Sequence, residues 1–203
     1  TATFEGAYVR RGVELAPEGS CLFAANSMSI RALDTFLLKS DKRLAVLCNR
    51  GLNGIDGTVS TALGAAQRFA QTTLITGDLT LLHDLNALAL QRELRVQRDQ
   101  AVARGERECA PSIVIVLLHN NGGGIFDMLP QRSDEAYFER LFLTPQEVDF
   151  QAAARAFSVP YCRAETVAAF DEAYRAALGV PGISLIEVRV PLRGLKERYA
   201  PCW

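Results

Sequence analysis

The sequence lacks closely spaced cysteines, long apolar segments and any strong excess of charge. It contains five cysteines whose spacings suit neither a metal site nor a redox pair, so reduced thiols in a cytoplasmic protein are the simplest interpretation. The longest strictly apolar run, Ile113 to Leu118, is far too short to span a bilayer. A formal net charge of -1 leaves no excess of basic residues for nucleic acid or an anionic membrane. We therefore expect no nucleic-acid partner and no membrane span. The cysteines are Cys21, Cys48, Cys109, Cys162 and Cys202.

A chain of 203 residues with 49% hydrophobic content can bury the core of one domain. Short apolar runs alternate with amphipathic helical patterns, which is typical of an α/β protein with a doubly wound parallel sheet and helices on both faces. We expect this domain over residues 20–192, with residues 1–19 as a linker or the end of a preceding domain and residues 193–203 as a C-terminal tail. The expected strands cover residues 21–25, 44–48, 72–76, 112–118, 160–163 and 182–190.

Two of the expected strands end in loops that are rich in oxygen atoms and glycine. The third strand leads into Gly77-Asp78, and the fourth leads into Asn120-Asn121 and three glycines. In a parallel sheet both loops lie at the carboxyl edge, where open α/β folds bind ligands. Carboxylate, amide and backbone carbonyl oxygens suit magnesium, and glycine N–H groups can hold phosphate. Each motif alone is more often a helix cap or a turn, but together they predict a site for a magnesium diphosphate.

A helix is expected directly after Gly77, where Thr80 or Asp78 could cap its first turn. Its apolar residues recur at three- and four-residue steps as far as Leu90. The mixed-charge residues 91–109 that follow are expected to form a helical extension and a solvated loop.

Candidate anion-binding groups follow the first two expected strands. Ser27 and Arg31 lie four residues apart at the start of a helix over residues 28–38, so a hydroxyl and a guanidinium share one face. Arg50 follows the second strand and is placed to meet an anion with two hydrogen bonds. The plain alternatives are a helix cap at Ser27 and solvated arginines. The adjoining loop, residues 51–57, holds three glycines, which allow the backbone to approach a ligand closely.

These motifs together resemble the thiamine-diphosphate enzymes, whose fingerprint begins with Gly-Asp and ends with Asn-Asn. The closer resemblance is to the synthase family of menaquinone and phylloquinone biosynthesis. It extends from about Leu15 to Val190 and matches only the C-terminal third of such an enzyme. Because the chain also starts at Thr1 rather than Met, we expect a fragment of a longer protein. The four blocks that carry the resemblance are residues 26–31, 49–57, 77–88 and 120–126.

The resemblance implies that thiamine diphosphate and Mg²⁺ bind to this chain. Asp78, Asn120 and the Gly122 carbonyl would hold the cation, and Ser27, Arg31 and Arg50 would meet substrate carboxylates. Ile55 resembles the apolar residue that bends the cofactor between its two rings, although core packing is its plain alternative. The residues implied in cofactor binding are Ile55, Gly77, Thr80, Asn120, Gly122, Phe126 and Leu129.

The implied reaction is the decarboxylation of 2-oxoglutarate and the addition of the resulting four-carbon carbanion to isochorismate. In this superfamily a glutamate from another domain, usually of a neighbouring subunit, activates the cofactor. We therefore expect no catalytic residue in this chain, and a homodimer or homotetramer for the full-length enzyme.

Two alternatives remain. One is a different thiamine-diphosphate enzyme, such as an acetolactate synthase or a 2-oxoacid decarboxylase, but a small uncharged substrate would not need Ser27, Arg31 and Arg50 together. The other is a nucleotide-binding or scaffolding α/β module without catalytic activity. We assign no acid–base role to the only two histidines, His83 and His119.

Overall fold

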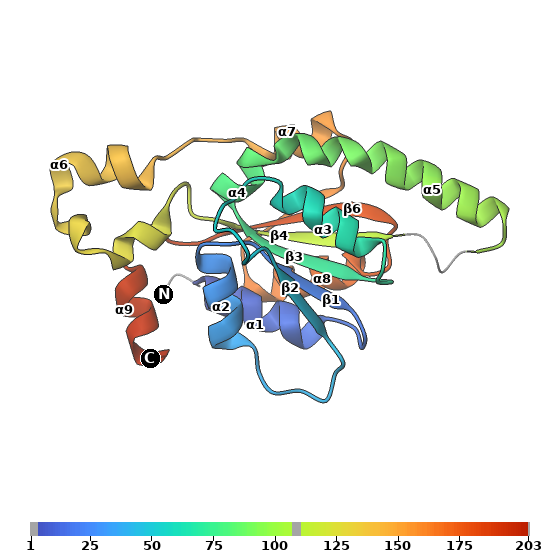
Figure 1. Ribbon diagram of the computed structural model, residues 1–203, viewed down its shortest axis with the longest axis horizontal. Coiled ribbons are helices and arrows are strands. Elements are labelled where there is room, and N and C mark those ends of the chain that lie inside the picture. Colours follow the sequence, from blue (N-terminus) through green and yellow to red (C-terminus); the bar gives the residue numbers. More distant parts are fainter. Residues whose placement is uncertain (1–3, 107–110, 203) are drawn as a thin grey trace.

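A single parallel sheet organises the chain. The computed structural model describes residues 4–106 and 111–202. Its six strands follow the order β2-β1-β3-β4-β6-β5, and every neighbouring pair is parallel (Figure 1). The predicted α/β class and all six predicted strands are therefore confirmed. The strands are β1 Cys21–Ala24, β2 Ala45–Cys48, β3 Thr72–Gly77, β4 Ser112–His119, β5 Tyr161–Ala164 and β6 Gly182–Arg189.

Helices cover both faces of this sheet because successive side chains of a strand point to opposite sides. In β4, Val114 and Val116 join a core with α1, α2 and α8, whereas Ile113 and Ile115 join a second core with α3, α5 and α7. Both faces of the central strands are thus buried, which explains their nearly continuous apolar sequences. The helices are α1 Glu5–Leu15, α2 Met28–Phe36, α3 Thr58–Ala66, α4 Asp78–His83, α5 Gln91–Ala103, α6 Glu135–Phe138, α7 Phe150–Ala156, α8 Val167–Ala177 and α9 Leu195–Tyr199.

The direction in which successive strands are added to the sheet reverses between β1 and β3. From β1 the chain moves outward to β2, whereas β3 and β4 lie on the other side of β1. Such a switch point opens a crevice at the carboxyl ends of the strands, and open α/β folds bind ligands there. The fold therefore brings the loops after β1, β3 and β4 to one place.

The region after β3 differs from the prediction of one continuous helix. Helix α4 ends at His83, a 3₁₀ segment covers Leu85–Leu90, and α5 then begins. Asp84 interrupts the helix, because its carboxylate accepts hydrogen bonds from Ser60 N at 2.7 Å and Ser60 Oγ at 3.1 Å. This contact with α3 could not be read from the local pattern.

The expected helical extension in residues 91–109 is present as α5, which projects beyond the sheet (Figure 1). Residues 107–110, and with them Cys109, lie outside the described residues. The other four cysteines are free thiols, and burial raises the pKa of Cys21 to about 11.

The predicted cap of α4 is wrong, because Gly77 holds the N-cap position and neither Thr80 nor Asp78 occupies it. Ser27 does hold the N-cap position of α2, but its side chain makes no capping hydrogen bond. Its φ of 65° and ψ of -131° depart from the extended backbone that a capping serine usually has.

Both ends of the described chain pack against the domain. In α1, Tyr8, Val9 and Val13 are buried in the core shared with α2 and α8. In α9, Leu195 is buried and its backbone N–H donates to Asp127 Oδ2 at 2.9 Å. The domain boundaries that we expect near residues 19 and 192 stay a prediction.

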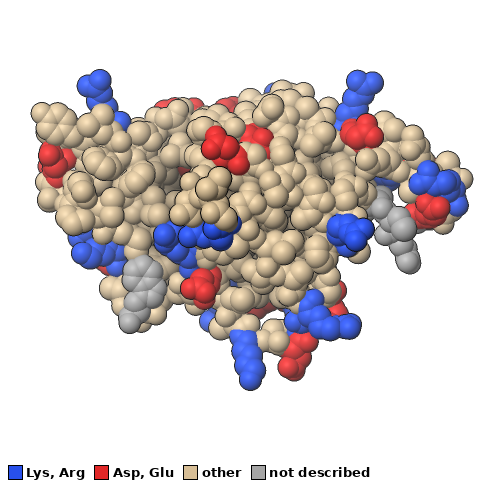
Figure 2. All heavy atoms as spheres, in the orientation of Figure 1, with Lys and Arg blue, Asp and Glu red and all other residues tan. Residues whose placement is uncertain are grey.

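Charged side chains of both signs are interspersed on the face seen in Figure 2, and no region of that face carries one sign alone. Within residues 4–106 and 111–202, no helix is both long and apolar enough to cross a membrane.

Candidate functional site

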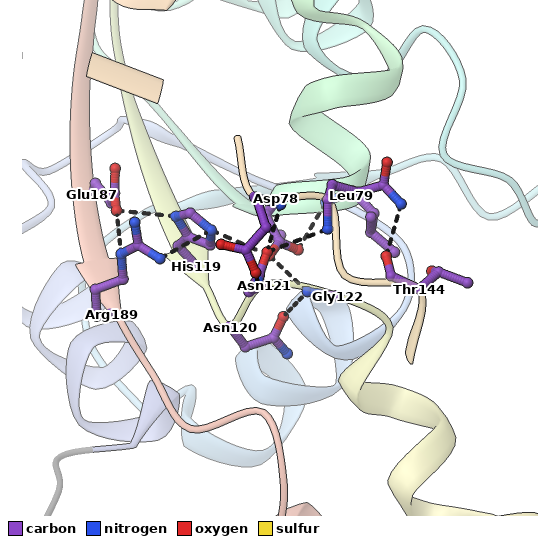
Figure 3. A network of polar contacts seen from close by, with 12 residues as sticks. Asp78, Leu79, His119, Asn120, Asn121, Gly122, Thr144, Glu187 and Arg189 are labelled. Carbon is purple, nitrogen blue, oxygen red and sulfur yellow. Dashed lines mark hydrogen bonds and ion pairs between the residues drawn. The ribbon is translucent and has the colours of Figure 1, made fainter. Parts of the chain in front are cut away.

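One backbone N–H joins the loops that follow β3 and β4. Gly122 N donates to Asp78 Oδ2 at 2.9 Å and to Asn120 Oδ1 at 3.1 Å (Figure 3). The second carboxylate oxygen of Asp78 accepts from Leu79 N at 2.8 Å. The three residues predicted to hold a cation, Asp78, Asn120 and Gly122, therefore touch one another.

The Gly122 carbonyl, proposed as a cation ligand, is already partly occupied. It accepts a hydrogen bond from Gly124 N at 3.0 Å, in a tight turn. A carbonyl oxygen has two lone pairs, so one remains available to a ligand.

Asp78 is 5% exposed, and its carboxylate forms no ion pair with a lysine or arginine among the described residues; the nearest basic side chain is His119, whose Nε2 lies 3.7 Å from Oδ2. Burial raises the pKa of this carboxyl above its ordinary range, and the N–H groups of Leu79 and Gly122 offset only part of that effect. A desolvated carboxylate of this kind is stabilised by a nearby cation. The donor set of carboxylate, amide and carbonyl oxygens fits a hard divalent ion.

The glycine turn after Asn120 leaves no room for side chains. Gly122 has a φ of +152°, and a Cβ there would lie 2.2 Å from the Leu143 carbonyl oxygen. Gly123 N also donates to that carbonyl at 2.7 Å. The side chain of Asn121 points away, where it accepts from Glu147 N at 3.0 Å and anchors the turn. Only Asn120 of the paired asparagines faces the candidate site.

A cavity of about 390 Å³ lies at this edge of the sheet. Its volume is in the range of small-molecule sites. Leu129 is not among its described lining residues, and this side chain is 39% exposed. The other predicted site residues line the cavity: Ser27, Arg31, Arg50, Ile55, Gly77, Asp78, Thr80, Asn120, Gly122 and Phe126.

The two predicted arginines reach the cavity from neighbouring loops. Arg50 Nη1 donates to Asn26 Oδ1 at 2.8 Å, and the amide of Asn26 donates to the Gly54 carbonyl. Arg31 Nη1 donates to the Ser27 carbonyl at 2.7 Å. Each guanidinium retains further N–H donors, so both can also bind an anion in the cavity.

Sequence reasoning missed Glu5, which lines the same cavity from α1. Its side chain is 4% exposed, and Oε2 has no hydrogen-bond partner among the described residues. Burial raises the pKa of Glu5, although the charge of Arg198 opposes the shift. The only sign of this role in the sequence was that Glu5 is a charged residue on the apolar side of its helix.

Glu187 in β6 and His119 at the end of β4 were also missed as parts of the site. His119 Nε2 lies 3.7 Å from Asp78 Oδ2, and His119 Nδ1 lies 3.0 Å from Glu187 Oε1. Glu187 is a charged residue between the apolar Ile186 and Val188 of β6, which is a signal that could have been noticed.

Comparison with known proteins agrees with this geometry. Residues 106–188 match the family described as thiamine pyrophosphate enzyme, C-terminal TPP binding domain. The benzoylformate decarboxylase of Polynucleobacter necessarius shares the fold, with a TM-score of 0.70 and 16% identity over 93% of this chain and 33% of its own. The chain therefore has the fold of thiamine-pyrophosphate enzymes, and residues 106–188 match their C-terminal TPP binding domain.

Relatives with higher sequence identity point to one enzyme family within this class. The 2-succinyl-5-enolpyruvyl-6-hydroxy-3-cyclohexene-1-carboxylate synthase of Bacillus velezensis is 42% identical over 188 residues, and that of Desulfitobacterium hafniense is 42% identical over 196 residues. The alignments cover 92% and 97% of this chain but 30% and 33% of the relatives, so the chain spans about one third of their length. The predicted resemblance to the C-terminal domain of this synthase family is confirmed.

We expect Gly122→Ala to destabilise the chain by about 3 kcal/mol or more, because the added methyl group would collide with the Leu143 carbonyl. Gly64→Ala is the matched control. Gly64 lies inside α3 with open space around its Cβ position, so this change should stabilise the chain by about 0.5–1 kcal/mol. Urea unfolding measures both values, and equal effects of the two changes would contradict the close packing of the turn.

We expect Glu5→Gln to stabilise the chain at neutral pH. The folded chain holds the Glu5 proton more tightly than the unfolded chain, so folding stability decreases as the pH rises from the ordinary pKa of 4.5 through the raised one. The amide does not titrate. The variant should therefore exceed the wild type by on the order of 1 kcal/mol at pH 8, and this gain should vanish near pH 4.

Urea unfolding at the two pH values measures this difference. Glu172→Gln, an exposed site on α8, is the control and should change stability little at either pH. A Glu5→Gln effect that is the same at both pH values would show that folding does not raise the pKa of Glu5.

Proposed function

We propose that this chain binds the diphosphate of thiamine diphosphate through Mg²⁺, as part of a 2-succinyl-5-enolpyruvyl-6-hydroxy-3-cyclohexene-1-carboxylate synthase. The observation that carries this proposal is the convergence of Asp78 and Asn120 on Gly122 N, at the edge of a cavity at the sheet's switch point. The names of the relatives and of the matched family support it.

In this proposal Asp78, Asn120 and the Gly122 carbonyl hold the cation, and backbone N–H groups at the start of α4 meet the phosphates. Gly77 allows the backbone to approach closely, and Thr80 lines the cavity one turn into α4. When bound, thiamine diphosphate supplies the carbanion and the electron sink of the reaction. The chain itself binds and orients this group.

Apolar residues shape the rest of the cavity. Ile55 lines it from the glycine-rich loop, where Thr58 Oγ1 donates to the Ile55 carbonyl at 3.2 Å and holds that loop to the start of α3. Phe126 lines it from the 3₁₀ segment Gly124–Met128 and packs edge-on against Phe142, with ring centroids 5.8 Å apart. We assign Ile55 to the position between the two rings of the cofactor and Phe126 to the cover of the cavity. We assign Leu129, which is 39% exposed, to the same cover.

Arg31 and Arg50 are the groups that we propose to bind the substrates. Arg31 and Arg50 place two permanent positive charges beside the Ser27 hydroxyl in the cavity wall. We assign them to the carboxylates of 2-oxoglutarate and isochorismate, which are both polyanions. The glutamate that activates the cofactor would come from the rest of the protein, in a homodimer or homotetramer of the cytoplasm.

We expect Asp78→Ala in the full-length protein to weaken Mg²⁺-dependent binding of thiamine diphosphate by about 100-fold or more, or about 3 kcal/mol. The change removes the only charged ligand proposed for the cation. Isothermal titration calorimetry measures the dissociation constant. Asp99→Ala, in an exposed ion pair with Arg98 on α5, is the control and should bind within about twofold of the wild type. Binding by Asp78→Ala at wild-type strength would refute the proposed site.

We expect Arg31→Ala and Arg50→Ala each to raise the KM of one substrate by about 10–100-fold, the loss that corresponds to a charge-assisted hydrogen bond of about 1.5–3 kcal/mol. Steady-state kinetics with 2-oxoglutarate and isochorismate would show which carboxylate each residue meets. Arg98→Ala is the control and should leave both KM values unchanged. A wild-type protein that prefers pyruvate to 2-oxoglutarate would instead favour an acetolactate-type synthase.

A further inference from the structure

A buried polar network lies directly behind Asp78. His119 separates Asp78 from Glu187, and its ring is 2% exposed (Figure 3). The ring packs edge-on against Phe150, with centroids 5.0 Å apart and an interplanar angle of 87°. The imidazole is therefore held in one orientation, with Nδ1 toward Glu187 and Nε2 toward Asp78.

Glu187 is also buried, yet its carboxylate is fully partnered. Oε1 lies 3.0 Å from His119 Nδ1 and 2.6 Å from Arg189 Nε, and Oε2 accepts from Tyr161 OH at 2.8 Å. Burial alone would raise the pKa of Glu187, but the hydrogen bonds from His119 and Tyr161 and the charge of Arg189 outweigh it and lower the pKa. Glu187 is therefore an anion that accepts hydrogen bonds and has no proton to donate.

These contacts determine which ring nitrogen of His119 carries the proton. Arg189 Nη1 lies 3.2 Å from His119 Nε2, and a guanidinium can only donate. Nε2 must therefore accept this hydrogen bond. The Glu187 carboxylate can only accept, so Nδ1 must be the nitrogen that bears the hydrogen.

The tautomer matters because Nε2 also faces Asp78. The distance of 3.7 Å from Nε2 to Oδ2 is too long for a hydrogen bond. A hydrogen on Nε2 would point at that oxygen, and a small shift would let it donate. It would then compete with a cation for the carboxylate.

We propose that Glu187 and Arg189 hold His119 in the tautomer with its hydrogen on Nδ1, and that this keeps a competing donor away from the cation site at Asp78. The inference rests on the proposed function, because it takes Asp78 as a ligand of Mg²⁺. His119, Glu187 and Arg189 are positioning residues that act through Asp78. Replacing an outer partner commonly changes metal affinity by about 10–100-fold, and here we expect such a change only where the replacement puts a hydrogen on Nε2.

The test is calorimetric titration of Mg²⁺ into full-length protein with thiamine diphosphate present. In Glu187→Gln the new amide can donate to Nδ1 and drive the ring hydrogen to Nε2, so the Mg²⁺ dissociation constant should rise about 10–100-fold. His119→Asn keeps an N–H group near the Nδ1 position and has nothing at Nε2, so it should stay within about threefold of the wild type.

Tyr161→Phe is the matched control. It removes a hydrogen bond to the same carboxylate but leaves both contacts of Oε1 intact, so Mg²⁺ affinity should stay within about threefold of the wild type. Thermal unfolding of the ligand-free variants shows that each is folded. Nitrogen NMR of histidine-labelled protein gives an independent measurement. The His119 signal, assigned by its absence in His119→Asn, should show an unprotonated Nε2 in the wild type and a protonated Nε2 in Glu187→Gln.

Three results would overturn the inference: wild-type Mg²⁺ affinity in Glu187→Gln, a loss in Tyr161→Phe as large as that in Glu187→Gln, or a comparable loss in His119→Asn. Each would show that the ring tautomer does not control the cation site. If the wild-type protein and Asp78→Ala bind Mg²⁺ and thiamine diphosphate equally, the proposed function fails and this inference fails with it. Tight wild-type binding that Asp78→Ala abolishes, together with unchanged Glu187→Gln, rejects the inference alone.

Discussion

The hydrogen bonds from Gly122 N to Asp78 and Asn120 are the contact on which the candidate site depends. They are possible because β3 and β4 are parallel and in register, with Gly77 opposite Leu118, so both strands end at the same level of the sheet. The N–H reaches both side chains only because the chain turns sharply, with a backbone conformation and a spacing at Gly122 that exclude a Cβ. The register of β3 and β4 and the sharp turn at Gly122 are therefore both needed to bring the oxygen atoms of Asp78 and Asn120 together.

Both carboxylates beside His119 are buried, but their pKa values shift in opposite directions. Glu187 receives donors from His119, Tyr161 and Arg189, and these hold its pKa low despite desolvation. Asp78 receives hydrogen bonds from backbone N–H groups but none from a described side chain, since His119 Nε2 stays 3.7 Å away, and its pKa is raised. The charge of Glu187 is thus offset by a guanidinium within the fold, whereas the carboxylate of Asp78 lies at the edge of a cavity without one. This difference in partners distinguishes a structural carboxylate from one suited to an external cation.

The strands could be predicted because a sheet buried on both faces requires apolar runs, and β4 is the plainest example. The positions of Asp78, Asn120 and Arg50 followed, since each comes directly after a strand. Contacts between distant segments could not be predicted. Asp84 interrupts the helix after β3 because it binds Ser60, and Ser27 loses its cap because of its left-handed backbone. The resemblance implied that Leu129 binds the cofactor, but Leu129 is not among the described residues that line the cavity and is 39% exposed.

The sequence by itself determined the α/β class, the order of its elements and the loops that hold the site, because hydrophobic periodicity and loop composition are local properties of the chain. It also determined which family the chain resembles. Only the tertiary structure decided which oxygen and nitrogen atoms meet: that Gly122 N serves both Asp78 and Asn120, that Asn121 turns away, that Glu5 reaches the cavity from α1, and that Glu187 lies behind His119. These contacts join residues of different elements, and their geometry depends on how the strands and helices pack rather than on any neighbouring stretch of sequence.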